Sequence, residues 1–375
     1  MVFSSATFLF LFLPVTLALY NLRLFKDKDR ETAKRNIVLL ITSLIFYSWG
    51  EPVYIVLMLL SIFYNYNAAI DIDRYIERPA RKKLVFVCAL IFNIFVLGFF
   101  KYYGFLTESL NSIFSLSLPV RDIPLPVGIS FYTFQVLSYV IDVYRGDVRV
   151  QKNIVPFAAY ISMFPQLIAG PIVQYSDVEK QLSEREVTRE KFAAGIMFFI
   201  KGLGKKVIFA NTVGAVYTEI LGMEPSSVSV VTSWIGIICY TLQIYFDFSG
   251  YSDMAIGLGK MLGFDFIQNF NFPYKSTSIT DFWRRWHISL SSWFRDYVYI
   301  PLGGNRRGTP RTIFNILVVW SLTGLWHGAA WNFIAWGAFY GIILIAEKYV
   351  FARVIEKLPV FIKYTVTMVI VILLK

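Results

Sequence analysis

Long apolar segments separated by short polar loops dominate the hydrophobicity pattern of this chain. Many of them approach the ~20 residues with which a helix crosses the hydrocarbon core of a bilayer. We therefore expect about ten membrane-spanning helices. Their predicted bounds are 3–20, 36–50, 53–70, 84–100, 154–171, 192–210, 228–248, 312–327, 330–347 and 359–374.

Two further apolar segments, 125–141 and 250–268, are interrupted by Gly, Pro, Ser or Asp. Such interruptions indicate re-entrant or broken helices, which persist at membrane depth only where protein or a wet cavity surrounds the backbone. Segment 172–191 has a different pattern, because charges of both signs recur at helical spacing. It predicts a solvated surface helix.

The composition supports an integral membrane protein. Hydrophobic residues make up 56% of the 375 positions and charged residues only 16%, with a mean hydropathy of +0.56, which is more apolar than a soluble domain. The net charge of +11 lies in short loops. We attribute it to the positive-inside rule and not to nucleic-acid binding, so the basic loops at 23–35 and 74–83 should face the cytoplasm. The first apolar segment lacks a signal-peptidase cleavage pattern and is interpreted as a retained span.

No internal repeat is visible, and residues 1–375 are predicted to form a single membrane domain. Cys88 and Cys239 fall in apolar segments, where a free cysteine behaves as a small hydrophobic side chain. The chain has neither a Cys-x-x-Cys pair nor a histidine cluster with ligand spacing. No metal site is therefore expected.

The chain has only two histidines, His287 and His327, and both lie in dense motifs. Histidine is the side chain whose ordinary pKa lets it exchange protons near neutral pH. These two are therefore the first candidates for catalysis, although a buried structural histidine is the alternative for each. Two carboxylates, Asp247 and Asp253, lie at the end of an apolar segment and are functional candidates as well. Pairing with a nearby arginine, or helix capping, would explain them equally.

Aromatic residues return at steps of three and four through 281–301, which predicts one face of a helix. Arg284, Arg285 and Arg295 occupy the other positions, as in an amphipathic helix at the cytoplasmic interface. The basic, glycine-rich turn that follows, with Asn305 and Arg306, is suited to holding an anion. Seven of the nine tryptophans lie between 283 and 336, and interfacial belts are the default explanation.

If this basic stretch is cytoplasmic, the span 312–327 runs outward. Its 16 residues cover ~24 Å, which places His327 deep in the membrane, toward the far leaflet. Gly324 and Gly328 flank this histidine and would let backbone and substrate approach the ring. His327 could then deprotonate a hydroxyl where a donor from the inner side meets an acceptor from the outer side.

Several enzyme classes are excluded by missing motifs. Ser292 and Asn332 stand where a His-x4-Asp acyltransferase would carry aspartate. The chain also lacks a Gly-x-Ser-x-Gly nucleophile elbow and a phosphate-binding Gly-x4-Gly-Lys loop. A covalent serine mechanism and an ATP-driven pump both lose support.

Five stretches carry a resemblance to a known family. They are Pro126–Phe134 (PVGISFYTF), Phe164–Pro171 (FPQLIAGP), Tyr245–Asp253 (YFDFSGYSD), Asp281–Arg307 (DFWRRWHISLS through GGNRR) and Gly324–Ala329 (GLWHGA). With them the sequence resembles the membrane-bound O-acyltransferases, and within that family the bacterial branch similar to alginate O-acetyltransferases. The last two stretches are the most specific.

The resemblance implies an all-helical fold with re-entrant elements around a central tunnel, in the bacterial inner membrane. It also implies that an acyl group passes from a cytoplasmic thioester donor to an extracytoplasmic acceptor. In this branch the acyl group is acetyl, the expected donor is acetyl-CoA with no tightly bound cofactor, and the acceptor is an exported polysaccharide such as alginate. A periplasmic acetyltransferase partner often completes delivery.

Residue by residue, His327 matches the catalytic histidine of the family, and His287 matches its second motif position, filled by Asn or His. We expect Arg284, Arg285, Arg295, Asn305 and Arg306 to steady the donor, and Asp247 to orient groups or stabilise charge. Members of this branch usually continue through further spans. The chain, which stops at Lys375, is therefore expected to be a fragment or a shortened form.

Two other functions stay open. A D-alanyl transferase of teichoic acid would share the chemistry but take its donor from a carrier-protein thioester; the uninterrupted Tyr299–Arg306 stretch favours the polysaccharide branch. A non-enzymatic subunit for polysaccharide export or transport would use the buried aspartate and histidine as a proton or sugar path.

Overall fold

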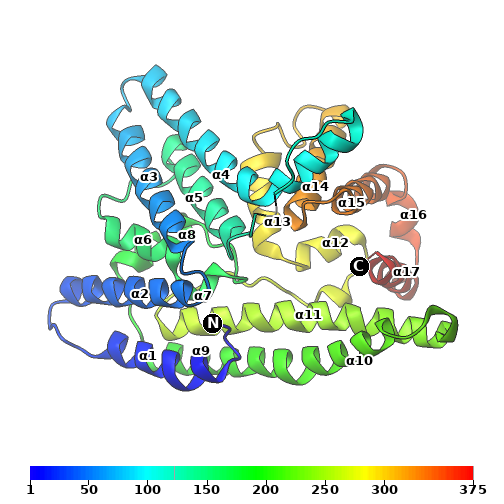
Figure 1. Cartoon of the computed structure of the whole chain (residues 1–375), viewed down its shortest axis with the longest axis horizontal. Helices are drawn as coiled ribbons and strands as arrows, with labels where there is room; N and C mark the ends of the chain where they lie inside the picture. Colours follow the sequence, from blue (N-terminus) through cyan, green and yellow to red (C-terminus); the bar gives the residue numbers. More distant parts are fainter. Residues whose placement is uncertain (122, 375) are drawn as a thin grey trace. The chain divides into compact units, whose positions relative to one another are not determined.

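The computed structural model describes residues 1–121 and 123–374. Every regular element in these residues is helical (Figure 1), which confirms the predicted all-α class. The chain divides into two compact units, and each is described separately. Unit 1 comprises Met1–Ala194 and Leu258–Phe266, and unit 2 comprises Gly195–Gly257 and Ile267–Lys375. The single membrane domain stays a prediction.

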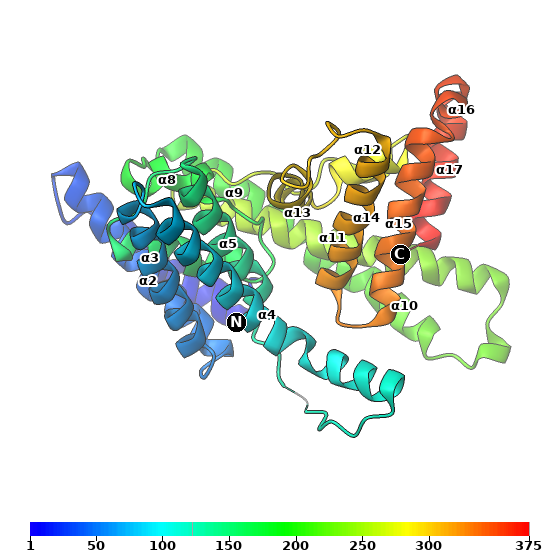
Figure 2. The same cartoon turned by 90° about the horizontal axis from the view of Figure 1, so that it is seen from above.

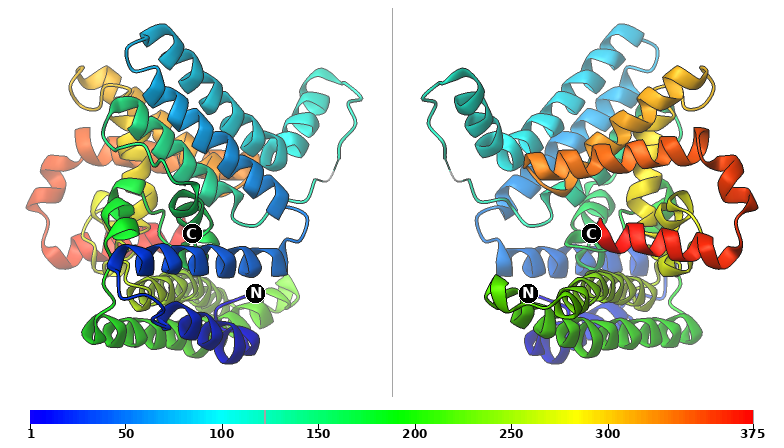
Figure 3. Two further views of the ribbon diagram at one scale, coloured as in Figure 1. Left: turned by 90° about the vertical axis from the view of Figure 1, so that its left-hand side faces the viewer. Right: turned by 90° about the vertical axis from the view of Figure 1, so that its right-hand side faces the viewer.

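Unit 1 contains the first eight α-helices and the start of the ninth. They are α1 (Leu13–Asn21, after a π-helical segment Phe8–Phe12), α2 (Lys28–Gly50), α3 (Ile55–Arg74), α4 (Pro79–Phe114), α5 (Ile129–Arg145), α6 (Ile154–Ser162), α7 (Phe164–Leu167), α8 (Tyr175–Ser183) and α9 (Arg189–Gly204). Helices α3, α4 and α5 pack against one another, and α2 packs on α6 (Figure 3). The C-terminal part of the long helix α4 extends away from the other helices of this unit (Figure 2).

A pair of buried asparagines joins α3 to α4. Nδ2 of Asn93 donates to Oδ1 of Asn65 at 2.7 Å, and Nδ2 of Asn65 donates to Oδ1 of Asn93 at 3.1 Å. Both helices are apolar enough to cross a membrane. In hydrocarbon a polar side chain on one span stabilises its neighbour only if it finds a partner, and such pairs contribute about 0.6–2 kcal/mol. The reciprocal amide pair therefore sets the register between α3 and α4.

Unit 2 contains the remaining helices. They are most of α9, a π-helical segment (Lys205–Ala210), α10 (Asn211–Leu221), α11 (Val230–Met261), α12 (Ile279–Arg285), α13 (Ile288–Phe294), α14 (Thr309–His327), α15 (Trp331–Tyr349), α16 (Ala352–Lys357) and α17 (Val360–Leu373). Helices α14 and α15 form an antiparallel hairpin through the short link Gly328–Ala330 (Figure 3).

Three helices in the described part of the chain, α3, α4 and α11, have the length and hydropathy needed to cross a membrane. Three shorter apolar helical stretches, Phe8–Asn21, Ile154–Leu167 and Val360–Leu373, accompany them. The structure is therefore that of an all-helical membrane protein. The expected count of about ten spans stays a prediction.

The segment 250–268 was predicted to be broken, and this was wrong for its first half. Helix α11 runs without interruption to Met261, through Gly250 and Gly257. These glycines serve close packing against α9. A Cβ at Gly250 would lie 2.8 Å from the carbonyl oxygen of Gly202, and a Cβ at Gly257 would lie 2.6 Å from that of Gly195. The glycines allow two backbones to touch, and the helix continues.

Two other segments predicted to be continuous are interrupted. The span 154–171 divides into α6 and α7 at Met163, whose backbone is not helical (ψ 109°), and Pro165 lies in the first turn of α7. The segment 172–191 is not one solvated helix. Helix α8 ends at Ser183, it buries Tyr175, Val178 and Leu182, and α9 starts only at Arg189. Conversely, 125–141 forms most of the unbroken helix α5, which starts after Gly128 (φ +76°).

Candidate active site

His287 lies between two short helices, and the prediction of a single helix over 281–301 was wrong. Helix α12 ends at Arg285, α13 begins at Ile288, and a π-helical segment, Arg295–Tyr299, follows α13. His287 itself adopts the left-handed conformation, with φ +46°. This conformation is uncommon for a side chain other than glycine, and it persists only where the surroundings enforce it.

Hydrogen bonds from an extended segment enforce the turn at His287. The backbone N–H of Ile288 donates to the carbonyl of Asn269 at 3.0 Å, and the N–H of Asn271 donates to the carbonyl of Arg285, also at 3.0 Å. The side-chain oxygen of Asn269 accepts from the N–H and the hydroxyl of Ser289, at 3.1 and 2.8 Å. These contacts hold the backbone on both sides of His287.

The His287 ring is buried, at 2% exposure. It packs edge-on against Phe248, with ring centroids 4.7 Å apart, and lies 5.7 Å from the ring of Trp326. Neither ring nitrogen has a hydrogen-bond partner in residues 1–121 and 123–374. Burial lowers the pKa of His287 well below its ordinary value, and the neighbouring His327 lowers it further. His287 is therefore a neutral imidazole at physiological pH.

His327 has a different environment. It is the last residue of α14, its side chain is exposed, and its ring packs edge-on against Trp336 at 5.1 Å and Trp326 at 4.9 Å. This imidazole is thus accessible at the end of a long helix.

The glycines around His327 allow close helix packing, and the expected approach of a substrate to the ring stays a prediction. A Cβ at Gly324 would lie 2.3 Å from the carbonyl oxygen of Phe333. A Cβ at Gly337 would lie equally close to that of Trp320, and one at Gly328 would lie 2.2 Å from the Phe333 ring. Helices α14 and α15 therefore touch backbone to backbone, which fixes the end of α14.

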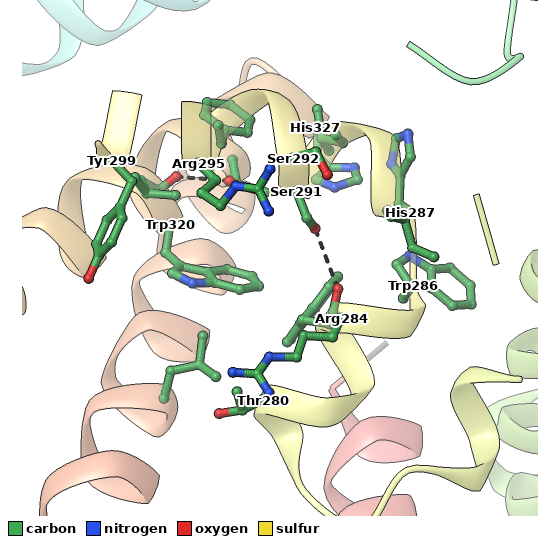
Figure 4. Close-up of a pocket in the computed structure, with 17 residues that line it drawn as sticks. Thr280, Arg284, Trp286, His287, Ser291, Ser292, Arg295, Tyr299, Trp320 and His327 are labelled. Atoms are coloured by element: carbon green, nitrogen blue, oxygen red, sulfur yellow. Dashed lines mark hydrogen bonds between the residues drawn. The ribbon is translucent and has the colours of Figure 1, made fainter. Parts of the chain in front are cut away.

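Both histidines line one cavity of about 510 Å³ within unit 2 (Figure 4). Arg284 and Arg295 reach into this cavity from α12 and from the end of α13. Its remaining lining residues are Thr280, Trp283, Trp286, Ile288, Leu290, Ser291, Ser292, Phe294, Tyr299, Val319, Trp320, Thr323 and Leu344. The lining thus combines two arginines, two histidines and several hydroxyl groups with aromatic and aliphatic side chains.

A second cavity of about 490 Å³ lies next to the first and shares three wall residues with it, Trp283, Trp286 and His327. Its other lining residues are Tyr240, Ile244, Phe282, Asn332, Phe333, Trp336 and Tyr340. No arginine or lysine of residues 1–121 and 123–374 lines it. His327 thus borders both cavities, whereas His287 borders only the basic one.

The other predicted site residues lie outside these cavities. Arg285 donates to Asp281 at 2.9 Å and to the carbonyl of Asn271 at 3.3 Å, so it fixes the turn before His287. Asp247 forms an ion pair with Lys206 across α11 and the π-helical segment. The sequence left open that Asp247 pairs with a nearby arginine. The structure shows such an ion pair, but its partner is a lysine.

The glycine-rich turn contacts the first cavity indirectly. Asn305 accepts hydrogen bonds from the hydroxyl of Tyr299, which lines the cavity, and from Nζ of Lys348 at 3.2 Å. Arg306 lies in the same turn and does not line the cavity. Gly303 and Gly304 have positive φ, of +108° and +53°, so the turn depends on glycine.

Comparison with known proteins identifies the family. The sequence profile of the membrane-bound O-acyltransferase family matches residues 147–372. The chain belongs to this family. The match includes both histidine motifs, and the predicted relationship is thereby confirmed.

The probable alginate O-acetylase AlgI of Pseudomonas aeruginosa is 46% identical over 352 residues, which are 93% of this chain and 66% of the relative. The peptidoglycan O-acetyltransferase of Helicobacter pylori is 36% identical, over 93% of this chain and 70% of its own length. The teichoic acid D-alanyltransferase of Bacillus subtilis is 27% identical, over 73% and 70%. The chain thus spans about two thirds of the length of these acyltransferases.

Several residues that line the cavities were not predicted from the sequence as site residues. Ser291 and Ser292 follow His287 by one helical turn and line the first cavity (Figure 4). Trp283 lines both cavities, and its indole N–H is buried with no hydrogen-bond partner among the described residues. Spacing from His287 could have indicated the serines. Trp283 was assigned to an interfacial belt, but it packs on Trp320 at 4.7 Å and on Tyr340 at 5.0 Å.

Proposed function

We propose that this protein transfers an acetyl group from a thioester donor, acetyl-CoA, to a hydroxyl of an exported polysaccharide, with alginate as the first candidate. The observation that carries the proposal is the position of His327. Its exposed ring stands in the wall shared by a basic cavity and an uncharged aromatic one. A base in that wall can reach two substrates that enter from different cavities.

The basic cavity suits the donor. Arg284 and Arg295 reach into it and supply guanidinium donors, which bind phosphate oxygens in a bidentate manner. Coenzyme A carries such phosphates. Arg295 is already engaged by Asp296, with hydrogen bonds of 2.7 and 3.0 Å, so Arg284 is the less encumbered of the two. The aromatic cavity, where tryptophan and tyrosine rings can stack on sugar rings, suits the acceptor.

The reaction itself needs one proton transfer and one exchange at the carbonyl carbon. His327 removes the proton from the acceptor hydroxyl, and the oxygen attacks the thioester carbonyl. The carbon–sulfur bond breaks, the new ester retains the acetyl group, and the thiolate leaves with the proton that His327 returns. Every bond and the transferred proton are therefore accounted for by His327 and the two substrates.

Two neighbouring groups support this step. Neutral His287 can accept or donate one hydrogen bond within the cavity without adding a positive charge that would oppose protonation of His327. The buried indole N–H of Trp283, which lines both cavities, can donate to the oxygen that gains negative charge.

We place the protein in the bacterial inner membrane, with the donor on the cytoplasmic side. The basic loops support this orientation. The acetyl group would reach the polysaccharide directly or through a periplasmic acetyltransferase. The relatives named for alginate and for peptidoglycan both transfer acetyl groups, which supports acetyl as the group.

The test compares ester-linked acetate on exported and wall polysaccharides in cells that express the wild type or His327→Ala at equal membrane levels. Loss of acetate from one glycan supports the proposal and identifies the acceptor. Unchanged acetate on every glycan, with folded protein present, contradicts it. Transfer of labelled D-alanine instead would favour the teichoic acid reading, and sugar movement without ester formation would favour a transport subunit.

A further inference from the structure

A buried arginine outside the candidate active site forms no ion pair within the described part of the chain. Arg185, in unit 1 after α8, is 5% exposed. It donates to the hydroxyl of Tyr20 at 2.6 Å, to Oδ1 of Asn36 at 2.7 Å and to the carbonyl of Gln181 at 3.2 Å. No ion pair joins it to a carboxylate in residues 1–121 and 123–374. An uncompensated buried charge is costly, so an anion is expected nearby.

The same arginine has an unused hydrogen-bond donor. Its Nη2 is buried and lacks a hydrogen-bond partner among the described residues. Arg185 lines a cavity of about 600 Å³ within unit 1, together with Arg35, whose Nε lies 3.6 Å from a carboxylate oxygen of Glu31. The two guanidinium groups lie 5.5 and 5.6 Å from the ring centroid of Tyr20. Two guanidinium groups therefore border one cavity, and Arg185 is the one that lacks a carboxylate partner among the described residues.

The acidic residues of the cavity do not serve as the missing counter-ion. Glu31 accepts from Lys34 and from two backbone N–H groups, and Arg35 lies 3.6 Å from it. Asp27 caps the start of α2, and Glu186 pairs with Lys28 on the surface. The two other carboxylates that line the cavity, Asp29 and Glu184, are exposed to solvent.

We propose that this cavity binds a phosphate group, either as a free anion or as the headgroup of an anionic phospholipid. A phosphate offers several acceptor oxygens to guanidinium donors and supplies the negative charge that Arg185 lacks. Residues of the basic segment 23–35, which comprises a loop and the start of α2, line the cavity, and the positive-inside rule assigns this segment to the cytoplasm. Anionic lipid headgroups gather at that membrane surface. The site is separate from the histidine cavities, and its function does not require acyl transfer.

The experiment uses the full chain purified in a neutral detergent. Phosphatidylglycerol, phosphatidylcholine and inorganic phosphate are titrated separately, and binding is measured by native mass spectrometry and by the thermal midpoint. We expect phosphatidylglycerol or inorganic phosphate to bind and to raise the midpoint, and phosphatidylcholine to do neither. Binding of inorganic phosphate alone identifies a free anion, and binding of phosphatidylglycerol alone identifies a lipid site.

Three variants decide the assignment. Arg185→Gln should weaken anion binding by about tenfold or more, because charge-assisted hydrogen bonds to the phosphate are lost. Arg23→Gln with Lys26→Gln, on the exposed part of the cavity, should weaken it by a few fold even if Arg185→Gln does not fold. Arg30→Gln is the control, since this exposed residue in the first turn of α2 does not line the cavity. No binding to the wild type, or equal binding to the double variant and the control, overturns the proposal.

Discussion

The segments that carry the two histidines are built in opposite ways. His287 is buried, neutral and held in a left-handed turn by hydrogen bonds from a distant segment. His327 is exposed at the end of a long helix, and glycine contacts with α15 fix that end. The difference shows that one chain can hold the same side chain buried and neutral in one place and accessible at a helix end in another.

Replacing His327 gives the largest effect and tests the assignment of the base. We expect His327→Ala to reduce acetyl transfer by ~10²–10⁴, the usual contribution of a positioned general base. The measurement is ester-linked acetate formed per unit of membrane protein. Because the side chain is exposed, the thermal midpoint should change little. A large fall in that midpoint would mean that the ring has a structural role.

At His287 the backbone and the ring can be separated. His287→Gly keeps the left-handed turn without strain but removes the imidazole, whereas His287→Val opposes the turn itself. We expect the Val variant to unfold at lower temperature and the Gly variant to lose mainly transfer activity. Equal activity of the Gly variant and the wild type would limit His287 to a packing role.

The helix contact behind His327 can be disturbed without touching the ring. Gly324→Ala places a methyl group 2.3 Å from the carbonyl oxygen of Phe333 and should destabilise the protein by about 1–3 kcal/mol. Gly98→Ala is the matched control, because no atom lies within 4 Å of its Cβ position. Thermal midpoints of the two variants give the comparison. If both behave alike, the contact between α14 and α15 does not hold the end of α14.

Replacing Arg284 should have a smaller effect, and it should change the binding of the acetyl donor alone. We expect Arg284→Ala to raise the KM for the acetyl donor by about tenfold, from the loss of one charge-assisted contact, with a smaller change in kcat. Arg306→Ala, in the adjacent turn but outside the cavity, should leave KM unchanged. Equal KM values for the two variants would place the donor elsewhere.

The smallest effect is a pH dependence of stability. The pKa of His287 is lowered in the folded protein, so below the ordinary value of ~6.5 the unfolded chain takes up a proton that the folded chain does not. Stability should fall as the pH decreases below ~6.5, by at most about 1.4 kcal/mol per pH unit. The thermal midpoint of His287→Asn should fall less steeply over the same range.

Sequence alone predicted the all-helical class and the family, because these depend on local composition and on short, specific motifs. The same motifs indicated both histidines as candidate site residues, and the structure shows that both line one cavity. It could not predict the turn at His287, which depends on hydrogen bonds from Asn269, distant in sequence. It also expected a break within 250–268, because Gly250 can serve either a turn or a close helix contact. Asp247 pairs with Lys206, which no local pattern around either residue indicates.

The wall shared by the two cavities has a further consequence for how such a protein can change. Under the proposed function, substitutions in the aromatic cavity would alter the shape presented to the acceptor without reaching Arg284 or Arg295. Among the described residues, only Trp283, Trp286 and His327 line both cavities, so only they would be constrained by both substrates. Divergence of acceptors around a retained donor chamber, or deliberate redesign of the acceptor, would therefore concentrate in residues such as Tyr240, Asn332 and Phe333.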